Sequence, residues 1–544
     1  MHKEAPAATS NSNLPTFGNS WKADLTSGFL VFLIALPLCL GIAQGSKFPP
    51  IAGVMTAVVG GIIASIFSNS ELTIKGPAAG MIAIVAGAIM DPAWLGGLKL
   101  SDAEIGKIGA ENYLHVYRYV LAVGVISGVV QVLMGLFRAG ILTEFFPMAP
   151  VHGLLASIGL IIISKQGYSM FGTKSRFDSP LHSLINLPGD VFGGAHLQVA
   201  IIGVLSLAIL FAYPWLKKKI MPLKYLPAQL VVLIIAIPLG QIFKLEPKFL
   251  VDLPEKLGDA IVFPDFSMAL TSVSLKWLLL FCLVGSLESL LSAKAIDILD
   301  PWKRKTNMNR DLLGVGAANT ASAAIGGMPM ISEILRSSAN IGNGGRTRVA
   351  NVAHGVFLFL SIVALASVVK MIPTAALGAM LVFAGFRLAS PKEFVHMWHI
   401  GKEQFFVFVL TIVCIFWNGN LLLVGVGMAA ELLINFFNGA KLGTLFKPSL
   451  AISSNGTSTT LQAFESLTFA NWIPLKRRTE QLADVPNVTL DLSEVKLVDH
   501  STMDKLLQSQ REFANAGRKL EITGLDHLRA FGHTPSSGRK HAAV

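Results

Sequence analysis

The sequence predicts an α-helical polytopic membrane protein that carries a small α/β domain near its C-terminal end. Apolar residues make up 52% of the 544 residues and charged residues only 14%, whereas an average soluble protein has about 25% charged residues. The mean hydropathy of +0.59 points the same way. A change of composition after residue 437 predicts the second domain. These observations exclude a cytosolic enzyme, a nucleic-acid binder and a disordered scaffold.

The net charge of +11 has a simple explanation in a membrane protein. Lys and Arg collect in cytoplasmic loops, so we expect no nucleic-acid partner. The cysteines Cys39, Cys282 and Cys414 lie in apolar stretches without metal-ligand spacing, so they predict no metal site. Residues 1–20 are polar and lack the apolar segment of a signal peptide, which predicts a disordered cytoplasmic tail.

A membrane-spanning helix needs about 20 apolar residues, and residues 21–437 contain fourteen candidate elements. They are 26–46, 51–68, 73–90, 117–137, 147–165, 198–215, 226–243, 274–296, 311–326, 330–341, 348–369, 372–388, 403–418 and 421–437. Two are weak as full spans, because 73–90 opens with Lys-Gly-Pro and 330–341 is short and polar. The longer connections 91–116, 166–197 and 244–273 are expected as outer loops.

Alternation from a cytoplasmic N-terminus places the main basic clusters on one side of the membrane, as the positive-inside rule requires. These clusters are Lys217–Lys219 with Lys224, Lys303–Lys305 with Arg310, Arg346 with Arg348, and Arg387 with Lys392 and Lys402. We therefore expect the inner (plasma) membrane, with the N-terminus and the C-terminal domain in the cytoplasm.

Fourteen elements divide into two halves of seven, and because seven is odd, the second half is inverted relative to the first. The two weak elements are then the third of each half. Interrupted helices at matching positions of inverted repeats point to a transport site near the middle of the membrane.

The C-terminal part is expected as a linker, 438–460, a soluble domain, 461–531, and a disordered tail, 532–544. A buried strand at 488–492 precedes a helix from Thr502 to Ala516 and a second strand from Lys519, which predicts a βαβ unit. The apolar face of that helix is expected to be Met503, Leu506, Leu507 and Phe513.

Glu288 is the strongest functional signal in the membrane part. It lies twelve residues after Lys276, so about 18 Å along the helix and near the middle of a hydrocarbon layer about 30 Å thick. An acidic residue at that depth is costly and is a functional candidate, and it suits a proton carrier. Ser292 lies one turn later on the same face.

A second signal predicts an anion pocket. Pro329 can break the chain and start the tenth helix, whose N-terminus attracts anions. Arg336 adds a fixed cation one to two turns later. The run from Gly76 to Gly80 can present a second helix N-terminus from the other half. Two opposed N-termini and one arginine favour an anion over a cation.

Structural alternatives remain open for these residues. Glu288 could be a protonated side chain that only bonds a neighbouring helix. Arg336 could form an ion pair with Glu333 or with Glu288, and Gly76-Pro77 could be an ordinary kink. For Lys75, at the inner mouth of the third element, we expect a side chain that extends to the membrane surface.

These motifs resemble those of the SulP anion transporters, the family that includes solute carrier family 26, over about residues 20–531. The residues that carry the resemblance are Ala35-Leu36-Pro37, Gly76-Pro77, Glu288-Ser289-Leu290-Leu291-Ser292, and Met328-Pro329 followed by Arg336. The C-terminal domain is similar to a STAS domain through Leu490-Asp491-Leu492 and Val498-Asp499-His500-Ser501-Thr502.

The resemblance implies a 7+7 inverted-repeat fold with core and gate domains, elevator-like movement and a homodimer in the bilayer. It places an anion between the third and tenth helices and Glu288 and Ser292 at the positions linked to cation coupling. It assigns to the anion pocket Leu38, Ile42, Ala78, Ala79, Leu335 and Arg336, and we add Gly76, Pro77 and Met330 as candidate substrate-binding residues.

Three departures from the family pattern bear on substrate and regulation. Many relatives have Gln and an aromatic residue where Leu38 and Ile42 stand, which implies a different anion preference. Glu288 instead of Asp favours H⁺ over Na⁺ as the coupling ion, whereas the run after Pro329 resembles a bacterial branch associated with bicarbonate. The phosphorylatable serine of STAS domains falls near Ser501, where we favour a packing role.

The sequence therefore predicts a secondary transporter of a small inorganic anion, sulfate or bicarbonate, coupled to H⁺ or Na⁺. Neither an enzyme activity nor a cofactor other than a coupling Na⁺ is expected, and no Walker-type phosphate loop indicates an ATP-driven pump. One alternative is a nucleobase permease of the same architecture, against which Arg336 argues. The other is an anion channel or a non-transporting membrane protein, against which Glu288 argues.

Overall fold

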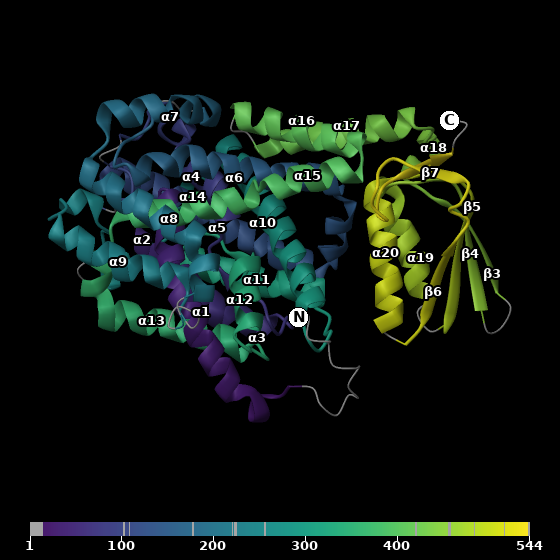
Figure 1. Ribbon diagram of the computed structural model, residues 1–544, viewed down its shortest axis with the longest axis horizontal. Coiled ribbons are helices and arrows are strands. Elements are labelled where there is room, and N and C mark those ends of the chain that lie inside the picture. Colours follow the sequence, from purple (N-terminus) through teal and green to yellow (C-terminus); the bar gives the residue numbers. More distant parts are fainter. Residues whose placement is uncertain are drawn as a thin grey trace. The chain divides into compact units, whose positions relative to one another are not determined.

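The computed structural model describes residues 15–541 except 102–103, 108, 177–178, 220, 222–225, 255–256, 419–420, 455–457, 483–484 and 516. The chain forms two compact units, and Figure 1 labels their helices and strands in chain order. The first unit comprises residues up to Gly140 and Ile158–Arg387, and the second comprises Ile141–Ser157 and the residues from Leu388 onward. Most of the predicted tail, 1–20, lies outside the described residues.

The seven elements expected in the first half are present, and helix α1 already begins at Phe17 because Thr16 caps it. Eight described helices in the whole chain are long and apolar enough to cross a membrane. The elements of the first half are α1 (Phe17–Gly45), α2 (Pro50–Val59) continued by η2 (Gly60–Ala64) and α3 (Ser65–Phe67), β1 (Ile74–Gly76) with η3 (Ala79–Met81) and α4 (Ile82–Ile89), α5 (Glu111–Leu136), α6 (Met148–Met170), α8 (Leu197–Lys219) and α9 (Ala228–Ile242).

The second half repeats this order, including a short strand before its third helix. Its elements are α10 (Ser272–Leu299), α11 (Met308–Ala324), β2 (Ile331–Glu333) with α12 (Ile334–Gly342), α13 (Val349–Lys370), α14 (Thr374–Leu388), α16 (Lys402–Asn418) and α17 (Val424–Phe437). The prediction of fourteen elements with interrupted third and tenth members is confirmed.

Two helices lie in segments expected as connections. Helix α7 spans Pro180–Gly194 with Pro188 inside it, and α15 spans Pro391–Ile400. Each begins with a proline at its first position, which favours a helix start. Both are too short to cross a membrane, so a search for long apolar segments does not find them.

Glycines bring the helices of the first unit into close contact. A Cβ atom on Gly128 of α5 would lie 2.5 Å from the backbone N of Thr320 in α11, and one on Gly316 would lie 2.7 Å from the backbone N of Val132. Small residues at such contacts let helix backbones approach and gain van der Waals energy, which holds helices together where lipid removes the hydrophobic driving force.

We expect the Gly53→Ala variant to be destabilised. A Cβ atom at Gly53 in α2 would lie 2.1 Å from the carbonyl O of Cys39 in α1, so the two helices must move apart, at a cost of about 1–3 kcal/mol. Gly425→Ala in α17 is the matched control, because its Cβ would meet nothing within 4 Å. Size-exclusion chromatography of detergent-solubilised protein after heating measures the difference, and equal stability of both variants would contradict this packing.

The second unit contains a six-stranded sheet. Its strands are β3 (Ser449–Ser454), β4 (Ser458–Leu467), β5 (Asn487–Val498), β6 (Lys519–Thr523), β7 (Leu528–Ala530) and β8 (Arg539–His541). Helix α19 (Trp472–Gln481) joins β4 to the parallel strand β5, and α20 (His500–Asn515) joins β5 to the parallel strand β6. Both helices lie on the same side of the sheet (Figure 1).

The predicted βαβ unit and the apolar face of its helix are confirmed. Met503, Leu506 and Phe513 of α20 are buried against β5, and Leu507 packs at the edge of that cluster. Two boundaries were wrong, because β3 lies within the expected linker 438–460 and β8 lies within the expected disordered tail 532–544. Strand β8 pairs with β5 and β7, so residues 528–541 complete the sheet; 542–544 lie outside the described residues.

Asp499 and Ser501 connect the sheet to helices α6 and α17 within the second unit. The carboxylate of Asp499 accepts hydrogen bonds from Phe469 N at 2.6 Å and from Asn435 Nδ2 of α17 at 3.2 Å. The Ser501 hydroxyl accepts one from Met148 N, the first residue of α6, at 2.9 Å. Ser501 is fully buried, which supports the packing role predicted for it.

Candidate functional site

Strand β1 of the first half and strand β2 of the second half form a two-stranded antiparallel ribbon, the crossing referred to below. Lys75 pairs with Ser332 and Gly76 pairs with Ile331. Each strand leads into a short helical segment, residues 79–89 after β1 and 334–342 after β2. Neither segment reaches the roughly 20 residues that a membrane-spanning helix needs. The ribbon therefore places two helix N-termini inside the bundle.

The prediction that Pro329 starts the tenth helix was wrong. The chain around Pro329 is extended, because Thr56 Oγ1 accepts a hydrogen bond from Met328 N at 2.8 Å and Asn319 Oδ1 accepts one from Met330 N at 2.7 Å. Helix α12 begins five residues later, after Glu333, whose carboxylate accepts a hydrogen bond from Arg336 N at 2.7 Å. A capping carboxylate and strand pairing together outweigh the helix-starting tendency of proline.

Arg336 is enclosed at this crossing, with no exposed surface. Its guanidinium donates from Nη2 to the carbonyl O of Pro77, from Nη1 to Cys39 Sγ at 3.5 Å and from Nε to Glu333 Oε2 at 3.3 Å. A Cβ atom on Gly76 would lie 2.6 Å from Nη1, so only glycine leaves room for this guanidinium. The ion pair with Glu333, one of the structural alternatives left open for Arg336, is present.

The guanidinium retains donors beyond these three contacts. A guanidinium has five N–H donors, and three of them are used in the bonds just described. The remaining donors lie on Nη1 and Nη2, in a place without exposed surface. Paired N–H groups in a fixed plane match the oxygens of an oxyanion. The same site therefore combines a fixed positive charge, spare donors and two helix N-termini.

The two short helical segments, 79–89 and 334–342, are called half-helices below. Glu288 of α10 lies against the start of the first of them, at Gly80. A Cβ atom on Gly80 would lie 2.0 Å from Glu288 Oε1, so the carboxyl group rests on the Cα of that glycine. Oε2 is enclosed and has no hydrogen-bond partner among the described residues, while the side chain as a whole is half-buried. Ser292, one turn later, is buried. A carboxyl group without protein donors is suited to hold a proton or a cation.

The remaining predicted site residues are buried to different degrees. Leu38 and Ile42 are buried within α1, but the α1 side chain that bonds Arg336 is Cys39. The buried set also includes Ala78 and Met330, and the half-buried set is Ala79 and Leu335. Sequence reasoning missed Cys39 as a contact of Arg336, because a cysteine in an apolar span carries no signal of its own.

The prediction for Lys75 was also wrong. Its side chain is 2% exposed and forms an ion pair with Asp311 of α11, with Nζ and Oδ1 2.9 Å apart. Asp311 is itself fully buried. Lys75 cannot reach the membrane surface because its residue belongs to the central strand pairing of the ribbon, and the buried carboxylate compensates its charge.

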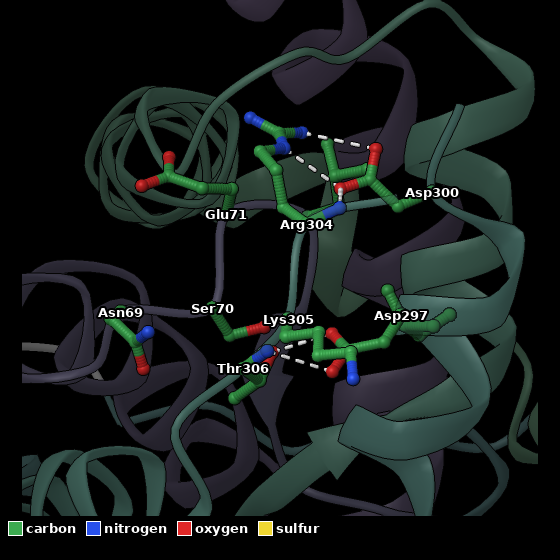
Figure 2. A pocket seen from close by; sticks show the side chains of 10 residues that line it. Asn69, Ser70, Glu71, Asp297, Asp300, Arg304, Lys305 and Thr306 are labelled. Carbon is green, nitrogen blue, oxygen red and sulfur yellow. Dashed lines mark hydrogen bonds and ion pairs between the residues drawn. The ribbon is translucent and has the colours of Figure 1, made fainter. Parts of the chain in front are cut away.

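A small pocket lies at the end of α10, apart from this crossing (Figure 2). Two of its carboxylates are bonded within it: Arg304 Nε lies 2.7 Å from Asp300 Oδ2, and Thr306 donates from N and Oγ1 to Asp297 at 2.7 and 2.6 Å. Asp297 comes nine residues after Glu288, which is about 13 Å along a helix. The pocket is therefore separate from the candidate site.

The model of one family, described as the sulfate permease family, matches residues 21–411. The putative sulfate transporter YvdB of Bacillus subtilis is 27% identical over 398 residues, which cover 72% of this chain and 69% of YvdB. The bicarbonate transporter BicA of Picosynechococcus is 24% identical over 362 residues, which cover 65% of this chain and 60% of BicA.

Among solved structures, the murine Slc26a9 anion transporter in its inward-facing state is similar with a TM-score of 0.67 and 16% identity. The similarity covers 96% of this chain and 90% of that one. At this identity the likeness shows a shared fold, which extends over both the helical part and the C-terminal sheet.

Proposed function

This chain belongs to the sulfate permease family, and from that membership we propose that it is a secondary active transporter of sulfate or bicarbonate. Members of the family are anion transporters and not enzymes. The observation that carries the proposal is the enclosed guanidinium of Arg336, which keeps spare N–H donors beside two helix N-termini.

The anion is proposed to bind at the crossing of β1 and β2. The first amides of any helix lack a partner within that helix. Here they belong to the segment after Pro77 and to α12, where Glu333 already accepts the amide of Arg336. Together with the Nη atoms of Arg336 they would surround an oxyanion with donors. Glu333 supports this arrangement because it holds Nε at 3.3 Å and caps α12, which orients the guanidinium.

Sulfate and bicarbonate both stay candidates, because relatives named for each are similar to this chain over more than half its length. Leu38 and Ile42, which the family resemblance assigns to the anion pocket, are buried apolar residues of α1. If Arg336 binds two of the four sulfate oxygens, apolar side chains offer no hydrogen bonds to the other two. This supports the smaller, singly charged bicarbonate as the substrate.

Coupling is proposed to run through Glu288, with Ser292 beside it. The carboxyl group has no hydrogen-bond partner for Oε2 among the described residues, so an ionised Glu288 would lie uncompensated unless a cation arrives. One carboxyl and one hydroxyl group supply two or three oxygens, fewer than the six or more that hard cations commonly take. This favours H⁺ over Na⁺ as the coupling ion.

Alternating access is proposed to move the ribbon and its two half-helices together, in an elevator-like motion. Several bonds tie them to longer helices: Ser332 N donates to Ser289 Oγ of α10 at 3.1 Å, and Lys75 N donates to Asn351 Oδ1 of α13 at 3.1 Å. We further propose a homodimer in the inner membrane with both the N-terminus and the C-terminal domain in the cytoplasm, where the basic loops face the anionic leaflet.

The test is uptake of labelled sulfate and bicarbonate into proteoliposomes with an imposed H⁺ gradient, an imposed Na⁺ gradient or none. Accumulation of one anion with the H⁺ gradient is the expected result. If accumulation follows the Na⁺ gradient instead, the proposed anion site stands but the coupling ion is Na⁺ and not H⁺. A conductance that follows the anion gradient alone, without accumulation under either gradient, would overturn secondary active transport.

The Gly80→Ala variant is expected to lose gradient-driven accumulation while it still exchanges anions. The new methyl group would lie 2.0 Å from Glu288 Oε1, and the flexible carboxyl end must leave its place rather than the backbone. Gly342→Ala, in the other half-helix, is the matched control because its Cβ would meet nothing within 4 Å. Normal accumulation by Gly80→Ala would show that the position of Glu288 against this helix is not needed.

A further inference from the structure

The two faces of the β1–β2 ribbon hold different ion pairs. Successive side chains of a strand point to opposite faces, so Lys75 and its register partner Ser332 share one face, while Gly76 and Glu333 lie on the other. The face of Gly76 and Glu333 holds the guanidinium of Arg336. The face of Lys75 and Ser332 holds the carboxylate of Asp311.

Asp311 contacts three segments on that face: β1, β2 and the residue that follows α3. Its Oδ1 lies 2.9 Å from Lys75 Nζ and accepts a hydrogen bond from Ser68 Oγ at 2.5 Å, while Oδ2 accepts one from Ser332 Oγ at 3.2 Å. Lys75 Nζ also donates to the hydroxyl groups of Thr73 and Ser68. Both charged side chains have 2% or less of their surface exposed, so water does not screen them.

From this arrangement we infer that Lys75 and Asp311 are a positioning pair that sets the affinity and the charge selectivity of the anion site on the opposite face of the ribbon. The inference rests on the anion site proposed above. As long as both charges are present, their fields largely cancel at that site. Removing one of them leaves the other uncompensated behind a ribbon only one strand layer thick.

The two members of the pair therefore have opposite effects on anion binding. At a separation of about 10 Å and an effective dielectric constant of about 20, one unit charge changes the binding of a monoanion on the order of tenfold. Because the interaction energy is proportional to the charge of the anion, the change for a dianion is about the square of that factor. A purely structural pair would weaken binding whichever member is removed.

The experiment is equilibrium binding of ³⁵S-sulfate to the purified full-length chain in detergent, with bicarbonate as a competing monoanion. Lys75→Met is expected to raise the Kd for sulfate about a hundredfold and that for bicarbonate about tenfold. Asp311→Asn is expected to lower both by similar factors, because the hydroxyl groups of Ser68 and Thr73 still hold the ammonium group. Lys75→Met combined with Asp311→Asn is expected to return both values to within about threefold of the wild type.

The outcomes separate this inference from the proposed function. If the wild type binds sulfate or bicarbonate but both single variants shift Kd in the same direction, or shift both anions equally, the positioning role is overturned and the anion site stands. If the wild type binds neither anion, both are overturned. Where Lys75→Met does not give monodisperse protein, tighter binding by Asp311→Asn and its reversal in the double variant decide the question.

Discussion

Replacement of Arg336 by glutamine is expected to reduce anion uptake at least a hundredfold. The guanidinium is fully buried and is the cation paired with Glu333. Its loss removes the donors available to the anion, deprives the carbonyl of Pro77 of its partner and leaves the Glu333 carboxylate uncompensated beside the site. Removing one member of a buried pair costs about 3–5 kcal/mol. Because Glu333 is 18% exposed, we expect the lower end of this range, which is about a hundredfold since every 1.4 kcal/mol is a factor of ten.

Arg336→Lys is expected to fail almost as completely, because an ammonium group keeps the charge but cannot contact Pro77, Cys39 and Glu333 at once. The matched control is Arg304→Gln, which breaks an ion pair of 2.7 Å with Asp300 at the end of α10 and should retain most uptake. Initial rates of sulfate and bicarbonate exchange in proteoliposomes measure both. An Arg336→Gln protein that is correctly folded and exchanges anions at the wild-type rate would contradict the proposed anion site.

The helical part of the fold could be predicted because long apolar segments are a property of the local sequence. The interruptions at 73–90 and 330–341 were also visible, since a Gly-Pro pair and a short polar segment are local signals. The placement of Glu288 in the middle of α10 followed from counting residues along one helix. Each of these predictions needs information from about 20 neighbouring residues.

The contacts of the site could not be predicted in the same way, because they join residues that are far apart in the chain. Lys75 and Asp311 are separated by more than 230 positions, and only the pairing of β1 with β2 reveals that one charge compensates the other. Strands of three residues have no visible alternation, so the ribbon itself carried no signal. The start of α12 was misplaced for a related reason, since the cap of Glu333 competes with Pro329 only once β2 has formed.

The C-terminal boundary illustrates the same limit. Strand β8 is Arg539–His541, three basic residues without β-propensity. It forms because it pairs with β5 and β7. The prediction of a disordered end used only the polar composition of the segment, which contains no information about these partners. The buried cluster that includes Leu490, Met503 and Phe513 could be predicted, because the spacing of apolar residues in a strand or helix is a local property of the sequence.

Replacement of Glu288 by glutamine is expected to abolish accumulation against a gradient while anion exchange continues. Glutamine is nearly the same size, so the contact with Gly80 is kept and the helices need not move. The amide cannot take up or release a proton, and it binds a cation more weakly than a carboxylate. The accumulation ratio of the labelled anion should therefore fall to about one under an H⁺ gradient, with an exchange rate within about threefold of the wild type.

Glu431→Gln is the matched control for this variant. Glu431 is fully buried, whereas Glu288 is half-buried, and in both residues Oε2 is enclosed without a hydrogen-bond partner among the described residues. Glu431 lies in α17, in the second compact unit, where Gln404 Nε2 donates to its Oε1 at 2.7 Å. If burial of an unpaired carboxyl group were enough for coupling, both variants would lose accumulation alike. We expect only Glu288→Gln to lose it, because Glu288 lies against Gly80 in a half-helix of the proposed anion site. Full accumulation by Glu288→Gln would assign coupling to another residue.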